Sequence, residues 1–291
     1  MRKLNAEIID KLIAARATGA EIDFVIWLSH YQNDAGLVRG VHYKDVCEEL
    51  QMAPQTFYNV KESLQRKGII EVQKDASFYT GDWNIHILDN DFSGELRPGK
   101  SLPSYLNTGL DVFYNQEFYA LKAAEKLMTM LYIKISGAGS PNYHVGTEHF
   151  YEKYTRLFGV QKRTLQNYLT GIRRFFAIGI KNREYWISPL RSKVKKENTL
   201  TDRSERVKQA CRSICRRFKL QEAGQAVSSL MEKYVYNVRI DPEPYFQESI
   251  IDLLSRRNYS ADPKRWTLRE INIKYLHKIF REHLPDAAII Y

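Results

Sequence analysis

The feature that most constrains the fold of this chain is an internal repeat. When the sequence is shifted by 108 residues, so that Leu50 falls on Phe158, apolar positions meet apolar positions and no gap is needed. The other matched pairs are Thr56 with Thr164, Phe57 with Leu165, Asn59 with Asn167, Leu64 with Ile172, Arg66 with Arg174 and Ile70 with Ile178. The repeat predicts that two segments of the chain fold in the same way.

The first copy has the pattern helix, turn, helix, hairpin. A short helix is expected at Tyr43 to Leu50, and a second opens at Pro54 after a three-residue break and ends at Gly68. One buried stripe is formed by Phe57, Val60 and Leu64. The segments "GIIEVQK" and "DWNIHIL" alternate apolar and polar residues, which predicts a half-buried hairpin with its turn at Asp75 to Asp82.

The second copy repeats this order with a shorter hairpin. Helices are expected at Tyr151 to Phe158 and at Gln161 to Phe176, and the hairpin at Ile178 to Ile187. The inward residues of the second helix are Leu165, Leu169, Ile172 and Phe176. An apolar helix pattern precedes each copy, "EIDFVIWLSHYQ" before the first and "KAAEKLMTMLYIKI" before the second.

Two copies of helix, helix-turn-helix and hairpin resemble the winged-helix family, over roughly residues 19–88 and 120–188. The resemblance implies a mainly α fold with small β-hairpins (α+β), in which two winged-helix domains precede a helical domain. The expected boundaries are 1–92 for the first winged helix, 93–118 for a linker, 119–190 for the second winged helix, 191–202 for a basic linker and 203–291 for four helices. Two winged helices in a chain of 291 residues also look like the initiators of small plasmids.

Charge is unevenly distributed along the chain. The net charge is +10, yet Val160 to Lys219 alone holds 17 basic and 4 acidic residues. Such a cationic region attracts a polyanion, either nucleic acid or an acidic membrane surface. The longest apolar run near the start, Phe24 to Leu28, is too short to span a bilayer, and no signal peptide follows Met1. We therefore expect a cytoplasmic protein with no membrane partner.

The stretch "GELRPGKS", Gly94 to Ser101, fits the phosphate-binding pattern G-x-x-x-x-G-K-[ST]. A working phosphate loop joins a buried strand to a helix, whereas Pro103 follows here and "SLPSYLNTG" has no helical apolar stripe. The Gly, Pro and Ser content favours an interdomain linker. Nucleotide binding remains the less favoured alternative, and no cofactor is expected.

The candidate site residues follow from the resemblance, which implies that the second helix of each helix-turn-helix enters the major groove. In the second copy the outward residues are Lys162, Arg163, Thr164, Gln166, Asn167, Thr170 and Arg173, with Lys181 and Arg183 at the hairpin tip and Lys195 and Lys196 in the basic linker. In the first copy they are Gln55, Thr56, Tyr58, Asn59 and Lys61, beside Glu62. The second set suits DNA better, and the first copy has protein contacts as an open alternative.

The candidates for catalysis or metal binding are weak. Seven histidines are scattered, with His144 and His149 beside an expected turn and no third ligand, and the three cysteines are expected to be reduced thiols. No nucleophile has a recognisable base. The sequence therefore predicts a non-enzymatic protein that binds double-stranded DNA sequence-specifically, with a dimeric transcriptional regulator as the first hypothesis and a plasmid or phage-type replication initiator as the alternative.

Overall fold

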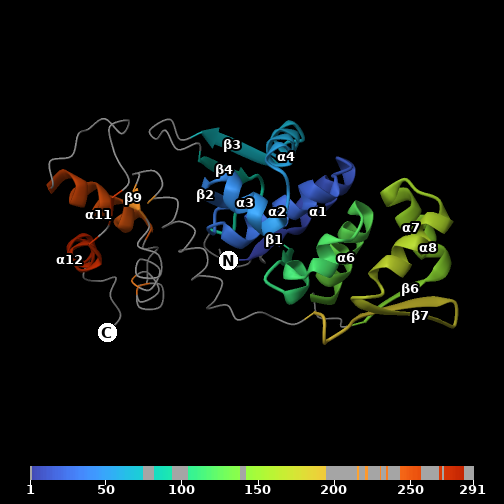
Figure 1. Cartoon of the computed structure of the whole chain (residues 1–291). Coiled ribbons are helices and arrows are strands. Elements are labelled where there is room, and N and C mark those ends of the chain that lie inside the picture. Colours follow the sequence, from blue (N-terminus) through green and yellow to red (C-terminus); the bar gives the residue numbers. More distant parts are fainter. Residues whose placement is uncertain are drawn as a thin grey trace. The chain divides into compact units, whose positions relative to one another are not determined.

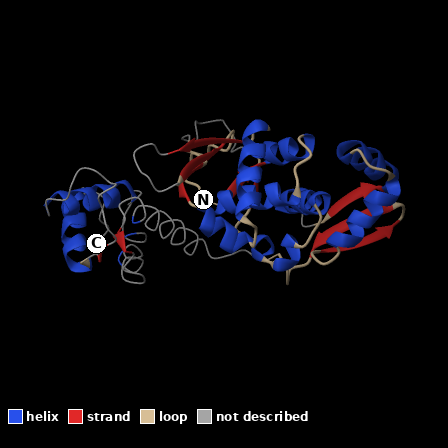
Figure 2. Ribbon diagram, turned by 45° about the horizontal axis from the view of Figure 1, so that its top comes forward, coloured by secondary structure: helices blue, strands red, loops and turns tan. Residues whose placement is uncertain are grey.

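The computed structural model describes residues 2–74, 82–93, 104–137, 142–194, 243–256, 269–270 and 272–284, with Cys215, Leu220, Gln221, Leu230 and Tyr234. Helices predominate over strands, as the ribbon in Figure 2 shows. The strands form small two- and three-stranded sheets. The chain divides into two compact units, one of residues 1–36, 46–71 and 86–197, the other of residues 37–45, 72–85 and 198–291. The predicted mixed α and β class is confirmed at this level.

The chain begins with strand β1 (Lys3–Asn5), helix α1 (Ala6–Ala14) and helix α2 (Gly19–Tyr31). The side chain of Thr18 accepts a hydrogen bond from the backbone N–H of Glu21, and the Glu21 carboxylate accepts one from the backbone N–H of Thr18, which together cap the start of α2. The residues from Phe24 to Leu28 are all buried, because α2 is covered on several sides. This helix is the apolar pattern expected before the first copy.

The first copy consists of strand β2 (Leu37–Val41), helices α3 (Tyr43–Leu50) and α4 (Pro54–Arg66), and strands β3 (Ile70–Lys74) and β4 (Trp83–Ile87). Both predicted helices are confirmed, and Phe57, Val60 and Leu64 are buried as expected. The sheet has the order β2-β4-β3, so it contains a strand that the sequence did not reveal. Residues 75–81 of the predicted hairpin turn lie outside the described residues.

The second copy repeats this order of elements and is drawn in green and yellow in Figure 1. Helix α6 (Ala123–Gly137) is followed by strand β6 (Tyr143–Gly146), helices α7 (Thr147–Phe158) and α8 (Lys162–Ile172), and strands β7 (Phe176–Lys181) and β8 (Glu184–Pro189). The sheet order is β6-β8-β7, with antiparallel neighbours. In both copies the last strand is therefore the central one.

Two predicted boundaries in the second copy are wrong. Helix α7 begins at Thr147 instead of Tyr151, because the residues before it pair with β8 only as far as Gly146. Helix α8 ends at Ile172 instead of Phe176, and Phe176 begins β7 opposite Pro189. Phe176 is buried as predicted, but it reaches the core from a strand, since helix and strand patterns cannot be distinguished by one apolar residue.

The second half of the predicted linker, from residue 104, packs against the first copy. It forms strand β5 (Tyr105–Asn107), the short 3₁₀ helix η1 (Asp111–Tyr114) and helix α5 (Gln116–Tyr119). Strand β5 pairs antiparallel with β1, and the hydroxyl of Ser29 on α2 donates to Thr108 Oγ1 at 2.8 Å. Burial lowers the pKa of His30 to about 3, so its neutral ring shares a 2.9 Å hydrogen bond with the Thr108 carbonyl.

A buried ion pair joins the two copies. Lys126 on α6 is 2% exposed, and its Nζ lies 2.7 and 2.6 Å from the two carboxylate oxygens of Asp23 on α2. Burial raises the pKa of Asp23 to about 6, although the nearby ammonium favours the ionised form. Helix α6 also packs on α1 and α8, so it is shared by both copies.

The C-terminal segment contains helices α11 (Glu243–Arg256) and α12 (Ile273–His283), which pack on each other, and a two-residue parallel pairing of β9 (Leu220–Gln221) with β10 (Arg269–Glu270). The prediction of a helix at "YFQESIIDLLSRR" is confirmed. The helix predicted at "LREINIKYLHKIF" begins only at Ile273, where Asn272 caps it. The other two predicted helices fall mostly outside the described residues.

Candidate nucleic-acid interface

The outward face of α8 carries most of the candidate residues. Lys162, Arg163, Gln166, Asn167, Thr170 and Arg173 are exposed, and Thr164 is half-buried. Leu165, Leu169 and Ile172 hold the opposite face in the core. Arg173 stands at the helix C-cap because α8 is shorter than predicted. The six exposed side chains thus lie together on one helix, as the sequence predicted.

Packing of α8 on α6 depends on the small size of Gly171. A Cβ at this position would lie 2.4 Å from Glu125 Oε1. Glu125 has its own role, since its carboxylate accepts a hydrogen bond from the backbone N–H of Lys122 at the start of α6. The glycine therefore lets α8 lie against the Glu125 carboxylate, which a larger residue at this position would have to displace.

The first turn of α8 is unusually cationic for a helix start. Lys162 and Arg163 are its first two residues, no acidic residue lies in this turn, and the N-cap residue Gln161 makes no side-chain capping hydrogen bond. Helix N-termini carry partial positive charge and unpaired N–H groups, so cations here destabilise the helix and anions stabilise it. This helix start is therefore suited to an anion that the described chain does not supply.

Tyr151 on α7 positions two residues of α8, and sequence reasoning missed it. Its hydroxyl lies 2.6 Å from that of Tyr185 and accepts a hydrogen bond from Gln166 Nε2 at 3.0 Å. The ammonium of Lys162 lies 4.3 Å from the centre of the Tyr151 ring, within the range of a cation–π contact. The only signal in the sequence was an aromatic residue on the helix that precedes the candidate helix. Such a signal is not specific enough to assign a role.

The hairpin between β7 and β8 ends in a two-residue turn. Asn182 and Arg183 both have positive φ, 51° and 62°, as in the type I′ turn that suits hairpins. Glycine is preferred at the second position, so Arg183 occupies a conformation that is strained for its side chain. The Arg183 carbonyl accepts a hydrogen bond from the backbone N–H of Thr147, which ties the hairpin tip to the start of α7. Lys181 and Arg183 are both exposed, as predicted.

The first copy presents a different face on α4. Gln55 and Asn59 are exposed and bonded to each other at 2.9 Å, while Thr56 and Tyr58 are half-buried. Lys61 was predicted to face outward, and this is wrong because its side chain is buried at 6% exposure, with its Nζ 5.6 Å from the Tyr58 ring centre. Lys61 lies four residues after Phe57, on the same side of the helix.

Of three other sequence features, two lie outside the described residues and one lies within them. Lys195, Lys196 and the segment "GELRPGKS" lie outside the described residues. The described chain after that segment, from Ser104, continues into strand β5 and not into a helix. His144 lies on β6, where its ring contacts that of Trp186 at a centroid distance of 3.6 Å.

Within the described ranges, no group of three or more His, Cys, Asp or Glu side chains is arranged to hold a metal ion. Of the helices whose placement is described, none has both the length and the apolarity that crossing a bilayer requires. Cys47 is half-buried, and burial raises the pKa of its thiol. The sequence was also compared with protein-family models, with curated proteins and with solved structures, and none of the three comparisons produced a match.

Proposed function

We propose that this protein binds double-stranded DNA without catalysis and reads base sequence through the exposed face of α8. The observation that carries the proposal is the cationic first turn of α8, where Lys162 and Arg163 lie at a helix start that lacks a side-chain cap. Phosphate groups bind well at such helix starts. A DNA backbone would offset the charge that the helix itself does not neutralise.

We also propose that each copy is a winged helix. Both have the order helix, strand, helix, helix, strand, strand, and both place the last strand at the centre of the sheet. In helix-turn-helix proteins the second helix of the motif enters the major groove. Helix α8 occupies this position in the second copy and α4 in the first, and the β7–β8 hairpin would be the wing.

The exposed residues of α8 then divide by chemistry. Arg163, Gln166 and Asn167 can reach base edges, because guanidinium groups pair with guanine and amides pair with adenine in the major groove. Phosphate contacts are assigned to the cations at the two ends of α8, at the hairpin tip and in the predicted basic linker, which are Lys162, Arg173, Lys181, Arg183, Lys195 and Lys196. Thr170 has a lesser part, since its hydroxyl donates to the Gln166 carbonyl at 3.0 Å.

A transcriptional regulator that acts as a homodimer is the first candidate role. A replication initiator is the second, and the Lys126–Asp23 pair is the observation in its favour. Because this pair joins the two copies within one chain, a monomer could place both helix-turn-helix motifs on one continuous site. Direct repeats in the bound DNA would favour an initiator, whereas an inverted repeat would favour a dimeric regulator.

The experiment that tests DNA binding is selection of randomised duplexes by the full chain, followed by anisotropy titration of the enriched duplex. We expect an enriched motif, and an affinity that falls about 10³-fold or more between 50 and 200 mM salt if six or more phosphates are contacted. No enrichment together with a flat salt response would refute the proposal. The spacing and orientation of the enriched half-sites decide between the two roles.

Nucleotide binding at "GELRPGKS" is the remaining candidate, and it is the least favoured because the described chain beyond it forms a strand. Isothermal calorimetry with ATP and magnesium should detect no binding, and Lys100→Ala should leave DNA affinity unchanged. Micromolar nucleotide binding that is lost in Lys100→Ala would instead support a phosphate loop.

A further inference from the structure

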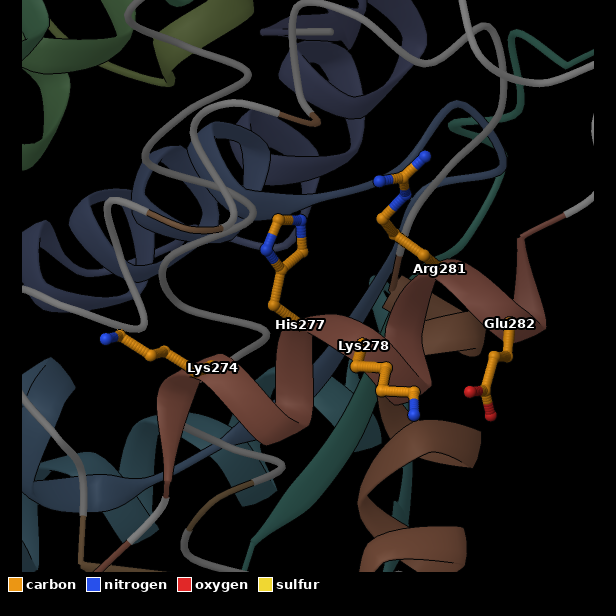
Figure 3. Close-up of a pocket in the computed structure, with 5 residues that line it drawn as sticks. All are labelled: Lys274, His277, Lys278, Arg281 and Glu282. Carbon is orange, nitrogen blue, oxygen red and sulfur yellow. The ribbon is translucent and has the colours of Figure 1, made fainter.

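Helix α12 has a basic stripe that its own fold does not require. Lys274, Lys278 and Arg281 are exposed at spacings of four and three residues, so they lie on one side of the helix. Leu276, Ile279 and Phe280 are buried on the other side. Figure 3 shows Lys274, His277, Lys278, Arg281 and Glu282 around a surface pocket of about 470 Å³.

Two of the three charges in this stripe, those of Lys274 and Lys278, do not stabilise the helix that carries them. Lys274 is the second residue of α12, where the partial positive charge of the helix start disfavours a cation, and this first turn has no acidic residue. Lys274 and Lys278 repel each other across one turn. Only Arg281 lies in the last turn, where a cation is favourable. The arrangement is thus explained poorly by helix stability and well by an external anion.

The acidic residues of α11 do not neutralise the stripe. Glu248 and Asp252 on α11 lie 3.8 and 3.1 Å from His283, not from the three cations. Within the described part of the chain, Lys274, Lys278 and Arg281 form no ion pair. His277 is engaged as well, because its Nε2 shares a hydrogen bond with the hydroxyl of Tyr234. Three cations and one carboxylate, Glu282, therefore line the pocket, and positive charge predominates there.

We infer that the stripe of Lys274, Lys278 and Arg281 binds the phosphodiester backbone of duplex DNA independently of base sequence. From Lys274 to Arg281 the helix rises about 10 Å, whereas charges on one DNA strand are spaced about 3.4 Å apart along the duplex axis. This length suits a polymer better than a single phosphate group. The C-terminal segment would then add affinity, while α8 supplies sequence preference. The inference rests on the proposed function, since it assigns a second contact to the same ligand.

The test uses the full chain with Lys274, Lys278 and Arg281 all changed to Gln. The fold should be kept, because the three side chains are exposed, and circular dichroism with thermal melting checks this. Anisotropy titrations with the selected duplex and with an unrelated duplex should both show a salt slope reduced by about 2 to 3. If electrostatic binding vanishes near 1 M salt, affinity at 0.15 M falls on the order of 10²-fold for both duplexes. The ratio of the two affinities should not change.

Two controls separate this inference from the proposed function. Glu282→Gln removes a charge at the same pocket without removing a cation, and it should not lower affinity. Arg163→Gln with Asn167→Ala should reduce the ratio between the selected and the unrelated duplex. If this ratio falls but the triple variant leaves the salt slope unchanged, the stripe does not contact DNA and the role of α8 still holds. If the unaltered chain binds neither duplex, the proposed function itself fails.

The source of the phosphate is tested by calorimetry with inorganic phosphate and with ATP. We expect no binding of either below 1 mM. A small phosphate compound that binds the unaltered chain but not the triple variant, together with an unchanged salt slope on DNA, would overturn the assignment to the DNA backbone.

Discussion

The two copies share a fold order and differ on the surface of their second helices. From Tyr43 to Arg66 the first copy has three basic and four acidic residues, whereas the equivalent stretch of the second copy, Tyr151 to Arg174, has six basic and one acidic. Where α4 has Gln55, Glu62 and Gln65, the repeat places Arg163, Thr170 and Arg173 on or beside α8. Asn59 and Asn167 match. The core pattern is thus compatible with two surfaces of different charge, of which the second is the more basic.

This contrast shows that the repeat reflects how the core of each copy packs, and that it does not indicate which ligand either copy binds. Most inward positions are apolar in both copies, as in the pairs Phe57 with Leu165 and Leu64 with Ile172, since a buried stripe is needed in both. Lys61 corresponds to Leu169, and both are buried. Outward positions can carry different residues in the two copies, because water solvates both amide and charged side chains. The following predictions test whether the copies differ in function as their surfaces do.

The largest effect is expected when the buried ion pair that joins the two copies is broken. Lys126→Met should lower the free energy of unfolding by about 3 to 5 kcal/mol, because the buried Asp23 carboxylate loses its partner. The loss should be greatest above pH 6 and smaller below it, since protonated Asp23 carries no charge that needs a partner. Urea denaturation at pH 5 and pH 7.5 measures both values.

The matched control is Lys126→Met combined with Asp23→Leu, which removes both charges and should recover most of the stability. A single-variant loss under about 1 kcal/mol would mean that this pair does not join the copies in solution.

The next largest effect is expected for the recognition of bases, which should distinguish the two copies. Asn167→Ala should cost about 1 to 3 kcal/mol on the selected duplex and almost nothing on an unrelated one. Asn59→Ala is the internal control at the equivalent position. Competition titrations with the two duplexes give both effects.

If only the second copy reads DNA, Asn59→Ala should be silent, whereas an effect on a different half of the footprint would mean that both copies read bases. Silence of both variants would remove sequence-specific reading from the proposal.

The turn inside each helix-turn-helix tests whether the two copies share the same backbone conformation. Gln51 and Gly159, which are equivalent in the repeat, follow α3 and α7 with φ of 51° and 63°. Gly159→Ala should destabilise by about 1 kcal/mol, for the backbone conformation alone, since a Cβ there would meet no atom within 4 Å. Gln51→Gly should stabilise by less than that. Thermal melting of the two variants should show shifts of opposite sign, and equal signs would contradict a shared turn.

The smallest effect is expected for the loss of the hydroxyl group of Tyr151, which positions the side chain of Gln166. Tyr151→Phe removes the hydroxyl that accepts from Gln166, so affinity for the selected duplex should fall by about 0.5 to 1 kcal/mol. The cation–π contact of Lys162 is kept, because the ring remains. Gln166→Ala should cost at least as much, and adding Tyr151→Phe to it should change affinity no further. Additive losses would show that Tyr151 acts through the fold and not through Gln166.

Much of the local structure followed from the sequence, because it depends on neighbours within a few residues. The bounds of α3 and the start of α4 were predictable from apolar spacing and from Pro54. The burial of Phe57 and Leu165 followed from the same spacing. The burial of Lys61 was also predictable, since it shares the face of Phe57 and matches Leu169 in the repeat. The outward candidates of α8 were found because a helix with one buried face must expose the other.

The tertiary structure alone decided what depends on distant partners. Strands β2 and β6 are short and weakly patterned, and they become strands by pairing with β4 and β8 far along the chain. The end of α8 was set by the pairing of Phe176 with Pro189, which competes with further helical turns. Lys126 and Asp23 are 103 residues apart in sequence. Local patterns carry no information about such contacts, because the free energy that selects them comes from burial and pairing between segments that meet only in the folded chain.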